Sequence, residues 1–204
     1  DRSGDTVATY GDVYGQWLNY TEIPPQLIEA VIATEDRRFF DHWGIDFRGL
    51  MRAIFNNVTA GQMVQGGSTI SQQLAKNLYL NSNKTLKRKI QELLLSFWLE
   101  MKLDKQEILT IYLNRAYFGS GAYGIDAASR TIFGHSARKL TLTESAMLAG
   151  ILKGPAFYSP LRDVERAYKR TAVVLDNMVA VGNINHATAE IAKSRNVKIM
   201  DAAA

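Results

Sequence analysis

The spacing of apolar residues constrains this chain more than any other feature of its sequence. From Pro24 onward, apolar side chains recur every three or four positions, the period of one face of an α-helix. The Pro24-Pro25 pair suits the first turn of a helix, because that turn needs no intrahelical N–H donors. The first stripe after it consists of Leu27, Ile28, Val31 and Ile32. A second stripe follows Asp46 and predicts a buried helix face: Phe47, Leu50, Met51, Ile54, Phe55 and Val58.

The segment from Thr85 to Lys102 carries the longest stripe, and its other faces are also fairly apolar. It therefore predicts a central helix that other helices cover, with this core side: Leu86, Ile90, Leu93, Leu94, Phe97, Trp98 and Met101. Further helices are predicted near 164–181, ended by Gly182, and near 186–194. Capping patterns mark three helix starts, at Thr69 with Gln72, Asp104 with Glu107 and Thr141 with Glu144.

These patterns predict a mainly α-helical chain with one principal domain over residues 24–195. Residues 1–23 lack the helical period and mix aromatic, polar and glycine residues, so we expect a hairpin or an extended lead-in. Residues 196–204 are expected to be a linker stump. No run of 18 apolar residues is present, and the chain opens at Asp1, so we expect an excised piece whose membrane anchor lies elsewhere.

Composition excludes several kinds of site. The chain has 204 residues and no cysteine, which excludes a disulfide framework, a thiolate zinc site and a cysteine nucleophile. Its three histidines are far apart and form no metal-binding motif. A net charge of +4 permits anionic partners such as phosphates or acidic membranes without requiring one.

The segment 35–44 places acids, bases and a histidine at the end of the first predicted helix. The helix macrodipole disfavours extra negative charge at that end, so the pKa of a carboxylate such as Glu35 is expected to be raised, which suits a general base. The alternative is a salt-bridged surface corner with no catalytic role.

The segment 66–73 leads with two glycines into a helix, and Lys76 and Asn77 follow it. Backbone N–H groups at such a helix start are a good seat for phosphate, although the Gly-Lys-Ser/Thr step of a P-loop is missing. An ordinary loop with an N-cap is the alternative.

Four cations then cluster at Lys84, Lys87, Arg88 and Lys89. They can bind pyrophosphate, nucleic acid or acidic lipid, or form a solvated helix start. Glu92 either pairs with Arg88 or has a functional role, because a lone carboxylate entering an apolar run is costly. The glycine- and tyrosine-rich segment 112–124 suits either sugar binding or plain packing.

Together these segments resemble the peptidoglycan glycosyltransferase family (glycosyltransferase family 51) over about residues 22–160. This family comprises the polymerase domain of class A penicillin-binding proteins and the monofunctional transglycosylases. Its motifs occur here in the family's order, at these positions: Glu35, Asp36, Phe39, His42 and Gly44; 66–73; Arg88, Lys89 and Glu92; 112–114 with 117–124; and 146–150 with Pro155 and 158–160.

The resemblance implies a lysozyme-like helical head with a smaller, membrane-facing jaw at about 45–67. It also implies polymerisation of lipid II into β-1,4-linked glycan, with inversion and release of undecaprenyl pyrophosphate. Glu35 would be the general base and Glu92 the second catalytic carboxylate. The substrate-binding residues implied by the family motifs are Arg38, Arg52, Ser68, Gln72, Gln73, Lys76, Lys84, Arg88, Lys89 and Asn114. Some relatives carry arginine at the position of Lys84, and lysine lacks the bidentate fork of arginine.

A divalent cation, Mg²⁺ or Mn²⁺, held at the pyrophosphate by Glu92 is one role that the resemblance leaves open, and no organic cofactor is expected. The implied partners are lipid II, the lipid-linked glycan chain and a membrane surface, with a transpeptidase domain in the full-length chain. The implied location is the outer, periplasmic face of the bacterial cytoplasmic membrane. The sequence leaves two alternatives: a lysozyme-like lytic enzyme and a basic helical nucleic-acid-binding domain, whose binding would weaken steeply with salt.

Overall fold

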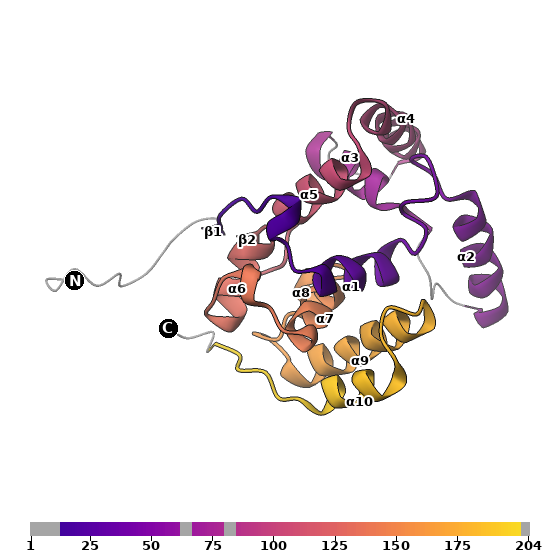
Figure 1. Ribbon diagram of the computed structural model, residues 1–204. Helices are drawn as coiled ribbons and strands as arrows, with labels where there is room; N and C mark the ends of the chain where they lie inside the picture. The colour runs from indigo at the N-terminus through magenta and orange to yellow at the C-terminus, as the bar shows by residue number, and fades with distance from the viewer. Residues whose placement is uncertain (1–12, 62–66, 80–84, 201–204) are drawn as a thin grey trace, which may run out of the picture.

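The computed structural model describes residues 13–61, 67–79 and 85–200, and these form a mainly helical structure, as predicted (Figure 1). The α-helices are α1 (Pro25–Glu35), α2 (Phe47–Ala60), α3 (Ile70–Tyr79), α4 (Leu86–Lys102), α5 (Lys105–Arg115), α6 (Ile125–Phe133), α7 (Leu142–Ile151), α8 (Pro155–Tyr158), α9 (Val164–Ala180) and α10 (His186–Ser194). Two 3₁₀ turns, η1 (Tyr20–Glu22) and η2 (Ala137–Lys139), and two short strands, β1 (Val13–Tyr14) and β2 (Ala122–Tyr123), complete the described elements.

The described part of the N-terminal segment is extended. Strand β1 pairs in parallel with β2, and the hairpin or extended lead-in expected over residues 1–23 stays a prediction. Residues 1–12 lie outside the described part of the chain. Asn114 on α5 holds the segment in place, because its side chain accepts a hydrogen bond from the Leu18 N–H and donates one to the Leu18 carbonyl.

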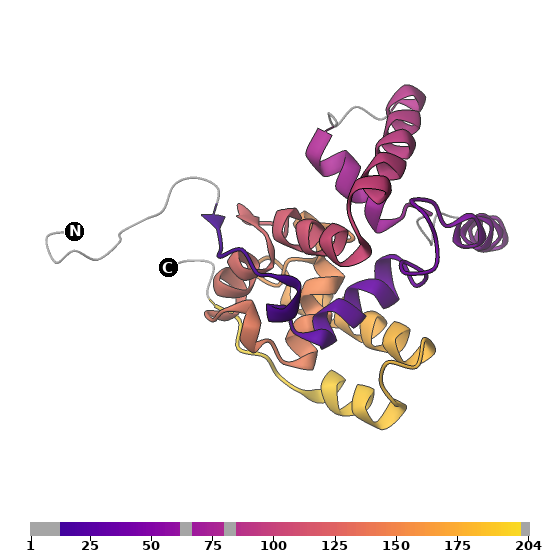
Figure 2. The same ribbon diagram turned by 45° about the horizontal axis from the view of Figure 1, so that its top comes forward.

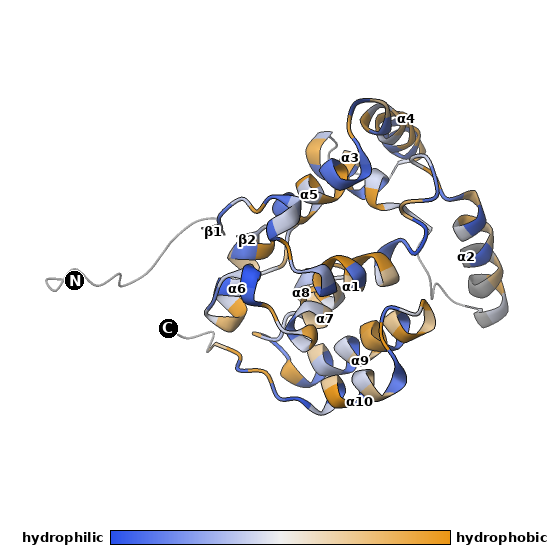
Figure 3. Ribbon diagram, viewed as in Figure 1, coloured by the Kyte–Doolittle hydropathy of each residue, from blue (hydrophilic) through white to orange (hydrophobic). Residues whose placement is uncertain are grey.

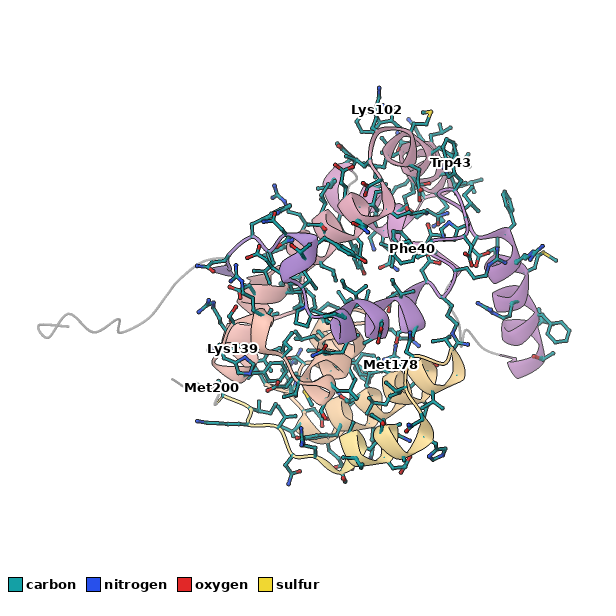
Figure 4. All side chains as sticks on the ribbon, viewed as in Figure 1. Phe40, Trp43, Lys102, Lys139, Met178 and Met200 are labelled. Carbon is teal, nitrogen blue, oxygen red and sulfur yellow. The ribbon has the colours of Figure 1, made fainter. Side chains whose placement is uncertain are left out.

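The main core lies where α7 packs against α1 and α9. α7 is buried on nearly all sides, and α9 contributes Val174, Leu175 and Met178, all with no exposed surface. Figure 4 places Met178 between the α1 and α9 ribbons. The helices that build this region begin and end close to the predicted positions, and α9 is followed by Gly182 in the left-handed region at φ +83°.

Side-chain caps begin several of these helices as the sequence predicts. Reciprocal capping boxes join Asp104 with Glu107 at α5 and Thr141 with Glu144 at α7. Thr69 forms only half of the predicted box at α3: its hydroxyl accepts from the Gln72 N–H at 3.2 Å, while the Gln72 side chain turns to the Gly44 carbonyl.

The burial predicted for α2 is wrong. The helix forms where expected, but its apolar stripe is exposed, with Phe47 and Phe55 each 68% accessible. Figures 1 and 2 show the reason, because α2 stands apart from the other described helices in both views.

The central position predicted for α4 is also wrong. Its apolar stripe is exposed at Leu86, Ile90, Leu94, Trp98 and Met101. The side that faces α3 and α5 buries Glu92, Ser96 and Glu100 together with Leu99. Figure 3 shows hydrophobic residues along the outer α4 ribbon. No described helix is both long and apolar enough to span a membrane.

Candidate active site

Glu35 is the last residue of α1, because the backbone of Asp36 leaves the helical region at φ −158°. Its partly buried side chain lines a cleft of about 580 Å³ formed by α1, α2, α3 and the segment from α7 to α9. Five cations line the same cleft: Arg37, Arg52 from α2, Lys76 from α3, Lys153 and Arg170. A carboxylate and a set of cations therefore share one space.

A hydrogen bond from Gln73 orients the Glu35 carboxylate. The Gln73 Nε2 donates to Glu35 Oε2 at 3.0 Å. Burial raises the pKa of the Glu35 carboxyl above its ordinary value, and the Gln73 hydrogen bond and the charges of Arg170 and Lys153 only partly oppose this effect. The direction agrees with the sequence prediction, but burial, not the helix macrodipole, is the main cause. A carboxylate with this property is suited to accept a proton near neutral pH.

Asp36, next to the candidate base, ties two helices together. Its carboxylate is 2.9 Å from His42 Nε2 and accepts a hydrogen bond from the Ile70 N–H at the start of α3. Thr69 adds a second tie, because its hydroxyl donates to the Gly44 carbonyl at 2.6 Å. The acidic motif at the end of α1 and the motif at 66–73 are thus joined at one point, which brings Gln73 opposite Glu35.

The sequence reasoning missed Lys153 and Arg170. Arg170 lies on α9 between the buried positions Ala167 and Val174, so an arginine on a core stripe was the available signal. Its Nε donates to the Gly150 carbonyl at 3.4 Å and its guanidinium lies 5.5 Å from the Tyr158 ring centre. Both contacts hold the cation against the wall of the cleft. No comparable signal marks Lys153 beyond its place before Gly154.

A second charged cluster lies beside the cleft, on α4. Glu92 is buried and its two carboxylate oxygens contact Arg88 at 2.6 Å and Lys89 at 2.8 Å. Lys89 Nζ also donates to Ser68 Oγ at 2.9 Å and to Gln72 Oε1 at 3.4 Å. Ser68 lines the cleft, so Glu92 reaches it indirectly, through the lysine and the serine.

The surroundings of Glu92 do not fit a metal ion held by the protein. Both carboxylate oxygens already face cationic side chains. Within the described residues, no group of three or more histidine, aspartate or glutamate side chains could hold one. A divalent cation would need ligands from the substrate.

The other predicted site residues are distributed around these two clusters. Arg38 pairs with Asp46 at 3.6 Å, and Asp46 itself lines the cleft. Gln72 is buried behind the cleft wall. Asn114 does not line this cleft: its amide N–H groups donate to the Leu18 and Thr110 carbonyls, and a substrate contact by this side chain stays a prediction. Lys84 lies outside the described residues.

Comparison with known proteins gives a consistent result. The family model for transglycosylase matches residues 3–179. Similar proteins include penicillin-binding protein 1A of Aquifex aeolicus, 46% identical over 90% of this chain and 25% of the relative, and that of Neisseria flavescens, 44% identical over 89% of this chain and 23% of the relative. The chain thus spans about a quarter of the length of these relatives.

The fold also matches a solved structure. The crystal structure of penicillin-binding protein 1A from Haemophilus influenzae is similar with a TM-score of 0.58 and 24% identity, covering 94% of this chain and 19% of that one. This likeness supports the helical fold. The family match covers most of the chain, and the first three sequence motifs lie where α1, α3 and α4 build the cleft and the cluster beside it. The chain therefore belongs to the transglycosylase family, the peptidoglycan glycosyltransferases that its motifs resemble.

Proposed function

We propose that this chain is a peptidoglycan glycosyltransferase domain that joins lipid II units into β-1,4-linked glycan. The observation that carries the proposal is the cleft that the partly buried Glu35 side chain shares with five cations. Transfer of a sugar from a diphosphate requires a base for the acceptor and positive charge for the leaving group.

In the proposed reaction, Glu35 accepts the proton of the 4-hydroxyl of the acceptor sugar. The hydroxyl oxygen forms a bond to the anomeric carbon of the lipid-linked donor as the bond from that carbon to the pyrophosphate oxygen breaks. This single displacement inverts an α-linked donor into a β-linked product. The raised pKa of the Glu35 carboxyl strengthens it as a base, while the Gln73 hydrogen bond keeps one of its oxygens in place.

The cations would stabilise the departing undecaprenyl pyrophosphate. Arg52, Lys76, Lys153 and Arg170 line the cleft, and Lys89 stands behind Ser68 at its edge. A lytic glycosidase has a sugar hydroxyl as its leaving group and no comparable need for this charge. The charge distribution therefore favours polymerisation over cleavage.

Glu92 would act as a positioning residue in this scheme. It holds Arg88 and Lys89 on α4, and Lys89 in turn contacts Ser68 and Gln72. A Mg²⁺ or Mn²⁺ ion would enter with the pyrophosphate. Because the described residues offer no cluster of ligands for it, such an ion would dissociate readily, and activity lost on chelation would return when the ion is added back.

The jaw at about 45–67 and helix α4 would lie against the membrane that contains the lipid substrate. The exposed apolar stripes of α2 and α4 support this assignment. Residues 62–66 of the jaw lie outside the described part of the chain. The proposed setting is the outer face of the bacterial cytoplasmic membrane, in a longer protein that also carries a transpeptidase domain.

Polymerisation of purified lipid II by Glu35→Gln protein tests the proposal. Removing the base should lower turnover by at least about a hundredfold, since general-base catalysis contributes about 10²–10⁴. Glu29→Gln is the matched control: the same change on the same helix, at a residue that does not line this cleft, should leave turnover unchanged. Wild-type turnover in Glu35→Gln protein, or cleavage of finished glycan without polymerisation by the wild type, would overturn it.

A further inference from the structure

A buried tyrosine stands behind the candidate base. Tyr112 on α5 is only 2% exposed, and its hydroxyl donates to Gln73 Oε1 at 2.9 Å. The amide nitrogen of the same Gln73 side chain donates to Glu35 Oε2 at 3.0 Å. Three side chains from α5, α3 and α1 therefore form one continuous hydrogen-bonded chain that ends at the carboxylate.

The tyrosine determines which way the glutamine amide faces. An amide has an acceptor at one end and donors at the other, and a carboxylate can only accept. While Tyr112 donates to the amide oxygen, the amide N–H₂ must point toward Glu35. In the reversed orientation the amide oxygen faces Glu35, which suits only a protonated carboxyl. Within the described residues, Gln73 is the partner of the Tyr112 hydroxyl, so that reversal leaves the hydroxyl proton without its acceptor.

We propose that Tyr112 is a positioning residue for the reaction, acting through Gln73 to keep Glu35 ionised and ready to accept the acceptor's proton. This inference rests on the proposed function. The amide occupies Glu35 Oε2, which leaves Oε1 as the oxygen that takes the proton. The phenol itself stays neutral, because burial and then the Glu35 charge raise the pKa of Tyr112 well above its ordinary value.

Other charges that face Glu35 act in both directions. Arg170 from α9 and Lys153 after α7 favour its ionised form, whereas Asp36, its neighbour in sequence, opposes it. Within the described residues, none of these groups forms a hydrogen bond with the Gln73 amide, so they bias the charge of Glu35 without setting the orientation of the amide. The orientation of the Gln73 amide is set by Tyr112.

Tyr112→Phe tests the inference, because it removes the hydroxyl alone. Phenylalanine cannot donate, so Gln73 is free to reverse and to stabilise the protonated Glu35. The pKa of the base then rises, and a base with a higher pKa is less ionised at any given acidic pH. The acid limb of the pH–rate profile for lipid II polymerisation should move to higher pH, with turnover on that limb reduced about threefold to tenfold, as expected for one hydrogen bond. The alkaline plateau should stay near the wild-type level.

Tyr168→Phe is the matched control. The Tyr168 hydroxyl bonds only to the Val197 backbone in the described chain, so its removal should lower stability without moving the limb. The position of the limb does not depend on how much of the protein is folded. A limb that coincides with that of the wild type, or a loss of equal size at every pH, would overturn the inference.

A direct titration separates this inference from the proposed function. In protein labelled with ¹³C at the glutamate carboxyl, the Glu35 resonance is identified by its absence from Glu35→Gln protein. Its titration midpoint should lie at higher pH in Tyr112→Phe than in the wild type, whether or not lipid II is polymerised. A shifted midpoint without any polymerisation would refute the function and keep the positioning role. An unchanged midpoint in an active enzyme would refute the role alone.

Discussion

Helices α4 and α9 have the same length, 17 residues each, and both are amphipathic. They differ in the face that they bury, which is the apolar face in α9 and the polar face in α4. α9 buries its apolar stripe against α1 and α7, including Val174, Leu175 and Met178. α4 exposes its apolar stripe and buries Glu92 and Glu100. Figure 4 labels one enclosed residue of α9, Met178, between the α1 and α9 ribbons.

The difference teaches what periodicity measures. The spacing of apolar residues tells which side chains share a face, but not what covers that face. On α4 the polar face is buried because each acid finds cationic partners: Arg88 and Lys89 for Glu92, and Lys105 for Glu100. A paired buried carboxylate is tolerated where a lone one is not.

The largest expected effect compares one leucine from each helix. Leu175→Ala in the core of α9 should lower the free energy of unfolding by about 2–5 kcal/mol, because it leaves a cavity. Leu94 on α4 is 64% exposed, so Leu94→Ala should change it by about 0.5 kcal/mol or less. Urea denaturation of both variants measures the contrast. Equal losses would mean that the α4 stripe is covered by protein.

A smaller effect is expected from the buried acid of α4. Glu100 Oε1 accepts hydrogen bonds from Ser71 Oγ at 2.6 Å and Lys105 Nζ at 2.7 Å. Glu100→Gln should cost about 1–3 kcal/mol of unfolding free energy, because it weakens a buried charge-assisted pair. Glu165→Gln, which removes an exposed pair with Lys169, is the control and should cost about 1 kcal/mol at most. An unchanged free energy of unfolding in Glu100→Gln would mean that the polar face of α4 is accessible to water.

The smallest effect concerns the membrane. Leu94 and Ile191 are both 64% exposed, one on α4 and the other on α10. If the α4 stripe meets lipid, Leu94→Gln should weaken binding to phosphatidylglycerol-containing vesicles about threefold to tenfold, the order expected from partial burial of one leucine. Ile191→Gln should have no effect in the same sedimentation assay. Identical behaviour of the two variants would remove α4 from the contact.

The fold follows from the sequence wherever local chemistry decides the outcome. The bounds of α4, α9 and α10, and the capping boxes of Asp104 and Thr141, were predictable because each depends on residues a few positions apart. The burial of α2 and α4 was not, because it depends on neighbours that are remote in sequence.

The candidate site divides in the same way. Glu35, Gln73 and Lys76 could be found from motifs, and the structure places them in one cleft. Arg170 and Tyr112 were missed as site residues, because each looks like part of a packed helix until the tertiary contacts reveal Glu35 nearby.

Two hydrogen bonds join the ends of the segment that contains α2, an excursion of the chain from Asp36 to Ile70. Thr69 donates to the Gly44 carbonyl, and the Ile70 N–H donates to the Asp36 carboxylate. The chain therefore leaves the neighbourhood of Glu35 and returns to it at the same place, where these two hydrogen bonds hold the outgoing and incoming segments together. Substitutions on the exposed face of α2, such as at Phe55, are therefore expected to leave the Glu35 carboxylate in place, because the junction beside it is held by residues at the two ends of the excursion.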